Sequence, residues 1–172
     1  FADVVAIVLA AARRPAYLML PKPRDAAELD RAAAAIDAGG GADIPLHALV
    51  ETHGALRDVQ ALAAHPRIES LSFGLMDFVS AHRGAIPQSA MGVQGQFEHP
   101  LVVRAKLEIA AACHAEGKVP SHCVVTEFKH TTALQEAASL AARRFGYTRM
   151  WSIHPAQIRP IVDAFTPTVA EI

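Results

Sequence analysis

The sequence predicts an α/β protein built around a parallel sheet. Five short, nearly continuous apolar segments alternate with stretches in which apolar residues recur at helical spacing. Continuous apolar strands separated by helices are typical of parallel sheets that helices cover. The length of 172 residues suits one domain, and a hydrophobic content of 52% is enough for a core. These observations leave two architectures open, an open doubly wound sheet or part of a (β/α) barrel.

The first elements follow from composition and from helix end signals. The alanine-rich residues 3–14 predict a helix, and "AYLMLPK" at 16–22 predicts a short strand. Residues 24–40 predict a second helix. Asp25 is a suitable N-cap with a glutamate three residues later, and Gly39 begins the stop signal.

The middle of the chain continues the alternation and then loses it. "IPLHALVE" at 44–51 and "RIESLSFG" at 67–74 predict strands on either side of a helix at 55–65. Residues 80–100 are rich in glycine, proline and serine and show no period. We interpret this segment as a long loop that could serve as a lid.

The last part of the chain predicts two further strands. Residues 101–117 predict a helix ending at a glycine, and "VPSHCVVTEF" at 119–128 predicts a strand. Residues 131–146 predict a helix with a threonine cap, "TRMWSIHP" at 148–155 the last strand, and 156–165 a final short helix. The strand count is therefore five.

Charged side chains sit at the ends of three predicted strands, where parallel α/β folds collect reactive groups. Glu51 ends the apolar run that precedes it, Asp77 ends the run from Ile68 to Met76, and Lys22 follows the first strand. About one strand–helix–strand unit separates the two acids, so they should meet at one rim. Two carboxylates there suit a Mg²⁺ ion that leaves positions for substrate oxygens.

An interpretation without a metal stays open for these residues. Glu51 could cap the next helix, and Asp77 could pair with Lys22 or an arginine. Lys22 could orient a substrate, or it could simply form an ion pair with Glu51. Gly54 and Gly74, beside the two acids, would permit a close approach of backbone.

Four segments together carry a resemblance to a known family. "LMLPKPRD", "LVETHGAL", "RIESLSFGLMDF" and "WSIHPAQIRPIVDAF" occur in this order across nearly the whole chain. They resemble the citrate lyase beta-subunit family, within the HpcH/HpaI aldolase superfamily. Each motif alone is weakly specific, but the combination is specific.

The resemblance implies a TIM-type (β/α)8 barrel with Glu51 and Asp77 as Mg²⁺ ligands. It also implies a carbon–carbon lyase that acts by retro-aldol or Claisen chemistry on a 3-hydroxyacyl-CoA such as citryl-CoA or malyl-CoA. A homo-oligomer, trimeric or larger, is implied as well. An aldolase of free 4-hydroxy-2-oxo acids at the same metal site is an alternative.

The chain departs from the family pattern at its start. It begins where the family is three strands in, so we expect residues 1–172 to be a single (β/α)-barrel domain that is N-terminally incomplete. Five strands do not close an eight-stranded barrel. The family's catalytic arginine lies on a missing strand, and no residue here can be given that role. A noncatalytic metabolite-binding barrel therefore stays open.

Further candidates are histidines and cysteines. We consider His53, two residues after Glu51, a candidate substrate contact and His154 a structural residue at the last strand end. His122 and Glu127 resemble metal ligands by type, but they would point to opposite faces of one strand. Trp151 is most simply a core residue. We assign no role to the other histidines.

The composition limits the possible partners and the compartment. The formal net charge of −1 gives no reason to expect nucleic acid or an anionic membrane surface. No apolar run approaches the roughly 20 residues of a membrane helix. Cys113 and Cys123 do not form a CxxC pattern, so we expect buried reduced thiols and a cytoplasmic location.

Overall fold

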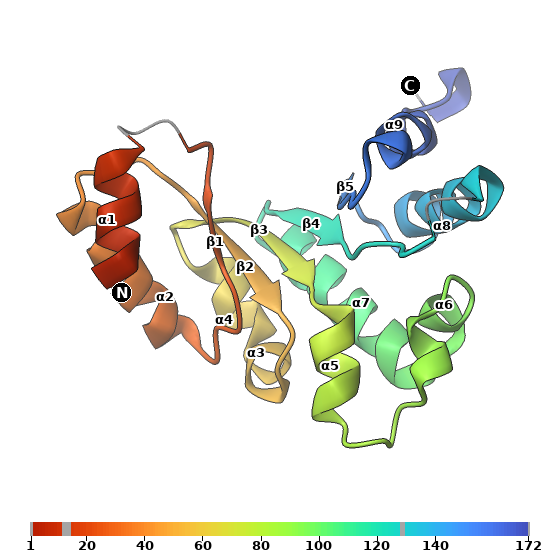
Figure 1. The fold of residues 1–172 in the computed structure, drawn as a ribbon, viewed down its shortest axis with the longest axis horizontal. Helices are drawn as coiled ribbons and strands as arrows, with labels where there is room; N and C mark the ends of the chain where they lie inside the picture. Colours follow the sequence, from red (N-terminus) through yellow and green to blue (C-terminus); the bar gives the residue numbers. More distant parts are fainter. Residues whose placement is uncertain (1, 12–14, 128–129, 172) are drawn as a thin grey trace.

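The five predicted strands are present and form one parallel sheet. The computed structural model describes residues 2–11, 15–127 and 130–171. The strands lie side by side in chain order, β1-β2-β3-β4-β5 (Figure 1). Their bounds are Leu18–Leu20 for β1, Leu46–Val50 for β2, Ile68–Phe73 for β3, Val119–His122 for β4 and Arg149–Met150 for β5.

Helices connect the strands, as the alternating pattern predicted. The α-helices are α1 (Ala2–Ala10), α2 (Ala26–Ala38), α3 (His53–Arg57), α4 (Val59–Ala64), α5 (Leu75–Ala81), α6 (Gly95–Glu98), α7 (Pro100–Ala115), α8 (Thr131–Arg143) and α9 (Ile158–Phe165). Three short 3-10 helices are η1 (Gln88–Met91), η2 (Pro155–Gln157) and η3 (Val169–Glu171).

The order of the strands decides between the two architectures. A doubly wound sheet reverses its strand order at a switch point, whereas a barrel adds each new strand beside the last one. All four pairings here are parallel and join strands that are consecutive in the chain. The sheet is therefore the five-stranded part of a TIM-type (β/α) barrel.

The main core lies between the sheet and the helices on one of its faces. Helices α4 and α7 pack against β3, and α7 also packs against β4. Alternate strand residues such as Ala48, Val50 and Leu71 are completely buried in this core. A smaller core joins α8 to α9 through Leu134, Ala138 and their neighbours. The helix-covered face thus holds the sheet rigidly and leaves the strand ends to form a site.

Several element boundaries differ from the predictions. The helix expected at 55–65 is two helices, and the first begins earlier because Thr52 caps it by accepting a hydrogen bond from the Ala55 N–H. The segment at 80–100 is not a continuous loop, since it contains η1 and α6. The strands expected at 119–128 and 148–155 are much shorter.

One of the two predicted helix caps is confirmed and the other is wrong. The cap predicted at Asp25 is confirmed, because its side chain accepts a hydrogen bond from the Glu28 N–H. The threonine cap predicted for α8 is wrong: Thr131 is the first helical residue, and His130 holds the N-cap position without a side-chain hydrogen bond. The predicted end of the first helix, at residues 12–14, and that of the strand reaching 128 lie outside the described residues.

Within the described part of the chain, no helix has the length and apolar character needed to cross a membrane.

Candidate active site

A pocket of about 200 Å³ opens at the carboxyl ends of strands β2 to β5. It lies where α/β barrels place their active sites. Its lining comes from four strand ends, the start of α5 and the 3-10 helix η1. The lining residues are Leu49, Glu51, Ser72, Phe73, Gly74, Leu75, Met76, Asp77, Met91, Cys123, Val124, Thr126 and Trp151.

Glu51 directly follows β2 and is the buried acid of this pocket. The residue is only 6% exposed. Gly74, which follows the neighbouring strand β3, makes room for it: a Cβ atom at Gly74 would clash with the Cβ and Oε2 atoms of Glu51. The close approach predicted for Gly74 is therefore present, and its purpose is to accommodate a carboxylate.

Lys22 joins the two acids. Its backbone N–H donates to Glu51 Oε1 at 3.0 Å, and its ammonium Nζ donates to Asp77 Oδ1 at 3.0 Å. The residue has a φ of 51°, in the left-handed region that a side chain with a Cβ seldom adopts. Such strain persists where neighbouring contacts impose it, and it is typical of functional sites. The ion pair expected between Lys22 and Glu51 is wrong in its partner, whereas the alternative pairing of Asp77 with Lys22 is confirmed.

Asp77 is positioned differently from the prediction. The strand ends at Phe73, and Asp77 lies in the first turn of α5, where a negative charge suits the helix dipole. Its side chain is 51% exposed. The alternative in which Glu51 caps the next helix is also wrong, since Thr52 has that role. The helix start brings Asp77 to the same rim as Glu51.

The two carboxyl groups influence each other. Burial raises the pKa of Glu51, and the negative charge of Asp77 and a hydrogen bond between the two side chains raise it further. The hydrogen bond from the Lys22 ammonium lowers the pKa of Asp77. Lys22 thus favours the ionised form of Asp77, whereas burial and the negative charge of Asp77 oppose ionisation of Glu51. A second cation beside the two carboxylates would favour ionisation of Glu51.

The donor set suits a hard divalent cation. Carboxylate oxygens are preferred by Mg²⁺, which commonly uses one or two of them and completes its shell with water or substrate oxygens. Glu51 and Asp77 are the residues that could hold it. In the described part of the chain, no group of three or more histidine, cysteine, aspartate and glutamate side chains is arranged to bind a metal.

His53 does not join this group. It lies in the first turn of α3 and lines a different pocket, together with Phe78 and His82 of the helix α5 region. Its ring lies edge-on to that of His82, with 4.5 Å between centroids. The start of α3 directs the His53 side chain toward α5, and a contact of His53 with substrate stays a prediction.

Other sequence candidates also have structural partners. His122 is buried against Lys106, with 2.8 Å between Nε2 and Nζ. Glu127 accepts a hydrogen bond from the backbone N–H of His130. His154 caps η2 by accepting from the Ala156 N–H, which confirms a structural role.

Sequence reasoning missed part of the pocket wall. Trp151 was expected in the core, but it is half-buried and lines the pocket. Ser72, Cys123 and Met91 also line it. A polar residue within an apolar strand was the available signal for Ser72, since Ser70 and Ser72 alternate on β3. Met91 carried no such signal, because its segment had no periodic pattern.

The fold and the site together define part of a (β/α) barrel with paired carboxylates at its carboxyl rim. No model of a known protein family matches the chain. A curated relative is the L-malyl-CoA/beta-methylmalyl-CoA lyase of Rhodobacter capsulatus, 26% identical over 190 residues. The match covers 100% of this chain and 58% of the relative.

Solved structures of citrate lyase and of the protein CitE are also similar to this chain. A citrate lyase from Burkholderia xenovorans LB400 has a TM-score of 0.94 and 57% identity, over 98% of this chain and 54% of that one. The Mycobacterium tuberculosis protein CitE, in complex with magnesium, acetoacetate and coenzyme A, has a TM-score of 0.79 and 24% identity, over 99% of this chain and 59% of that one.

The chain is thus similar over nearly its whole length to citrate lyase beta-subunit proteins and malyl-CoA lyases, and the resemblance predicted from the four segments is confirmed. It spans a little more than half the length of the curated relative and of the citrate lyase. The activity of the whole protein is therefore a proposal.

Proposed function

We propose that this chain forms the metal-binding part of a Mg²⁺-dependent carbon–carbon lyase. The proposed reaction is cleavage or formation of the C–C bond between the α-carbon and the hydroxyl-bearing β-carbon of a 3-hydroxyacyl-CoA. The observation that carries the proposal is the meeting of Glu51 and Asp77 beside a pocket at the carboxyl rim of the sheet. The similar proteins named as malyl-CoA lyase and citrate lyase support the reaction class.

Each residue of the site has a specific part in this proposal. Glu51 and Asp77 would hold Mg²⁺, which supplies charge stabilisation for an enolate. Lys22 keeps Asp77 ionised, since its ammonium lowers the pKa of that carboxyl group. Gly74 leaves the space in which the Glu51 side chain lies. Leu49, Phe73 and Trp151 give the pocket an apolar wall, which would limit the access of water to the reacting bond.

The size of the pocket limits what enters it. A volume of about 200 Å³ suits a short acyl chain with its carboxylate and carbonyl groups, and the remainder of a CoA thioester would extend beyond it. The names of the relatives support malyl-CoA as the first substrate to assay. Cleavage would break one C–C bond, with the hydroxyl proton leaving as the carbonyl product forms and a proton returning to the enolate carbon.

The proposal is tested by Asp77→Asn and Glu51→Gln in the full-length protein. We expect each change to lower Mg²⁺-dependent cleavage of malyl-CoA by at least about 100-fold, because losing a ligand costs more than the 10- to 100-fold typical of its supporting partners. Calorimetric titration with Mg²⁺ should show a matching loss of binding. Circular dichroism checks that the fold is kept.

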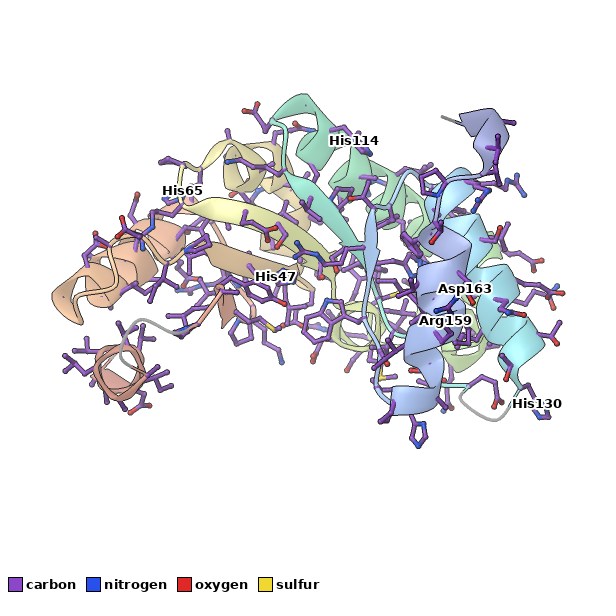
Figure 2. The ribbon with its side chains drawn as sticks, turned by 90° about the horizontal axis from the view of Figure 1, so that it is seen from above. His47, His65, His114, His130, Arg159 and Asp163 are labelled. Carbon is purple, nitrogen blue, oxygen red and sulfur yellow. The ribbon has the colours of Figure 1, made fainter. Side chains whose placement is uncertain are left out.

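Asp163→Asn is the matched control. Asp163 forms an ion pair with Arg159 on α9, with its side chain 48% exposed, close to the 51% of Asp77 (Figure 2). We expect this variant to bind Mg²⁺ and to turn over like the wild type. Unchanged Mg²⁺ binding and turnover in Asp77→Asn would contradict the proposal.

Two alternative functions have an observation in their favour. The small pocket would also take a free 4-hydroxy-2-oxo acid, which favours an aldolase at the same metal site. Among the described residues that line the pocket there is no arginine, which favours a noncatalytic metabolite-binding barrel. Parallel assays of CoA thioesters and free oxo acids distinguish the aldolase from the proposed lyase. Mg²⁺-dependent binding of these compounds without turnover would identify the noncatalytic barrel.

We also propose the wider setting of this chain. Residues 1–172 would be one barrel domain whose remaining strands lie outside this sequence. A cytoplasmic location is supported by Cys113 and Cys123, which are buried and free. We also propose a homo-oligomer of three or more subunits, for which Ile158 and Val162 of α9, large apolar side chains that are exposed, would offer a contact surface. Light scattering tests the oligomeric state.

A further inference from the structure

A buried polar network lies on the face of the sheet away from helices α4 and α7, beside the pocket. Its centre is His47 of β2, which Figure 2 shows on the opposite side of the strands from His114 of α7. Ser70 and Ser72 of β3 flank the imidazole, at 2.6 Å from Nδ1 and 2.9 Å from Nε2. All three residues are at most 1% exposed. Buried polar atoms of this kind need complete hydrogen bonding.

The inner end of the network determines which imidazole nitrogen carries a proton. Ser70 donates its only hydroxyl proton to the Glu69 carboxylate. The Ser70 oxygen also accepts from Nη1 of Arg149 at 3.2 Å, and Arg149 is in turn paired with Glu69. Ser70 therefore has no proton left for His47 and must accept one from it. Nδ1 of His47 consequently carries the hydrogen.

The outer end of the network leads to the pocket wall. The Trp151 Nε1–H, which can only donate, is 2.8 Å from the Ser72 hydroxyl oxygen. Ser72 keeps its own proton and donates it to Nε2 of His47. Burial and the charge of Arg149 lower the pKa of His47 to about 4, which agrees with a neutral ring. Every donor in the chain thus points the same way, from Trp151 to Glu69.

Trp151 and Ser72 both line the pocket, whereas His47 does not. Tyr17 also contacts the imidazole of His47: the two rings stack with 5.2 Å between centroids and 28° between planes. A second ring contact links His47 to Trp151, at 5.7 Å. The indole therefore has one hydrogen bond and one ring contact that depend on this histidine.

We propose that His47 is a positioning residue that, through Ser72, sets the orientation of Trp151 and thereby the shape of the pocket wall that selects the acyl group. The ligand class follows from the proposed function, a short 3-hydroxyacyl chain. The hydrogen-bond chain itself does not depend on that function. The sheet would then determine the width of the pocket at Trp151, because Ser72 and His47, which hold the indole in place, both belong to strands.

The direct test is nuclear magnetic resonance of the indole and imidazole nitrogens in the full-length protein. Trp151 is the only tryptophan of the 172 residues, and Trp151→Phe identifies its signal. We expect the indole proton signal to lie downfield in the wild type and to move upfield in Ser72→Ala and in His47→Leu. Ser72→Thr, which keeps the hydroxyl, should restore it.

Ser121→Ala is the matched control. Ser121 pairs with Ser72 in the sheet register and is equally buried, but its hydroxyl oxygen has no hydrogen-bond partner within the described structure. This variant should leave the indole signal unchanged. The inference is overturned if Ser121→Ala moves the signal as far as His47→Leu, or if only Ser72→Ala moves it.

A measurement on the wild type keeps the inference testable if His47→Leu does not fold. Nitrogen-15 shifts of the imidazole should show the neutral form with its proton on Nδ1. A proton on Nε2, or a protonated ring at pH 7, would reverse the donors and overturn the inference.

The kinetic consequence separates this inference from the proposed function. In an active enzyme, Ser72→Ala and His47→Leu should raise KM for the acyl substrate by roughly three- to tenfold, the effect of one lost hydrogen bond, with a smaller change in kcat. Equal KM values in variant and wild type would overturn the role in selection. Absence of any lyase activity in the wild type would contradict only the proposed function, because the nitrogen signals would still report the hydrogen-bond chain.

Discussion

Gly74 shows how one residue can decide whether a buried acid is tolerated. Its φ of −86° is available to any residue, so backbone conformation does not require a glycine there. The requirement is space, because the Glu51 side chain occupies the position that a Cβ would take. A single methyl group therefore competes directly with the candidate metal ligand.

We predict that Gly74→Ala displaces the Glu51 carboxylate. The overlap should lower the free energy of unfolding by about 1–3 kcal/mol, the usual cost of overpacking, and should weaken Mg²⁺ binding as well. Urea unfolding and a Mg²⁺ titration measure the two effects. Gly92→Ala is the control, since its Cβ would meet only the Ser89 carbonyl oxygen, at 3.3 Å. Equal losses in both variants would contradict the steric explanation.

At the scale of single residues, the sequence identified the two acids but not all of their contacts. Glu51 and Asp77 stood out because a carboxylate beside an apolar run needs a partner. Lys22 was recognised as a neighbour, yet only the structure shows that its backbone binds one acid and its ammonium the other. The left-handed backbone of Lys22 produces this division, and no sequence pattern announces it.

Among the elements, the short helix α3 illustrates how a cap positions the site. Thr52 directly follows Glu51, and its side chain accepts a hydrogen bond from the Ala55 N–H at 3.0 Å. The last residue of β2, the acid Glu51 and the cap Thr52 are thus consecutive in the sequence. The end of β2 and the start of α3 are fixed by the same three residues, which holds the Glu51 backbone firmly at the rim.

We predict that Thr52→Ala lowers the free energy of unfolding by about 1 kcal/mol, the usual loss for an N-cap. For a chain of this size, the thermal midpoint should fall by about 2–4 °C. Thr131→Ala is the control, because Thr131 is exposed at the start of α8 and does not occupy the N-cap position. Calorimetry compares the two variants, and an equal fall in both would contradict the assigned cap.

Within the whole molecule, one buried cation influences stability. Lys106 of α7 is completely buried, and its ammonium is 2.9 Å from Gln96 Oε1 and 2.8 Å from His122 Nε2. It also lies over the Phe97 ring, 4.0 Å from the centroid. Burial lowers the pKa of Lys106 from 10.5 to about 8. The group links α6, α7 and β4 behind the pocket.

We predict that this lysine makes stability increase with pH above about 8. Between pH 8 and 10.5 the unfolded chain binds a proton that the folded chain has released, so the free energy of unfolding rises by up to about 1.4 kcal/mol per pH unit. Below pH 8 both states are protonated and this contribution is constant. Denaturant unfolding of the wild type and of Lys106→Met, across this range, measures the difference.

The comparison with Lys106→Met removes the effect of groups on which the Lys106 charge does not act. Cys113 and Cys123 have raised pKa values through burial, and they act in the opposite direction at alkaline pH. The contribution of Cys113 cancels in the difference, whereas that of Cys123 cancels only in part, because the charge of Lys106 lowers the pKa of Cys123. Parallel stability curves from pH 8 to 10 would contradict the prediction.

By itself, the sequence determined the alternation of five strands with helices, the parallel sheet, the cap at Asp25 and the two acids at its rim. These features depend on local periodicity and on hydrogen bonds between near neighbours, which a single sequence displays. It also misjudged the segment at 80–100, because helical turns as short as η1 and α6 show no period.

Tertiary structure alone decided the consecutive strand order, the place of Asp77 on a helix, the place of His53 in a separate pocket and the presence of Trp151 in the wall of the candidate site. The physical reason is distance along the chain. Trp151 meets Ser72 across 79 residues, and which nitrogen of His47 holds a proton depends on two serines of another strand. Such contacts arise only when the strands are placed side by side, so no local pattern encodes them.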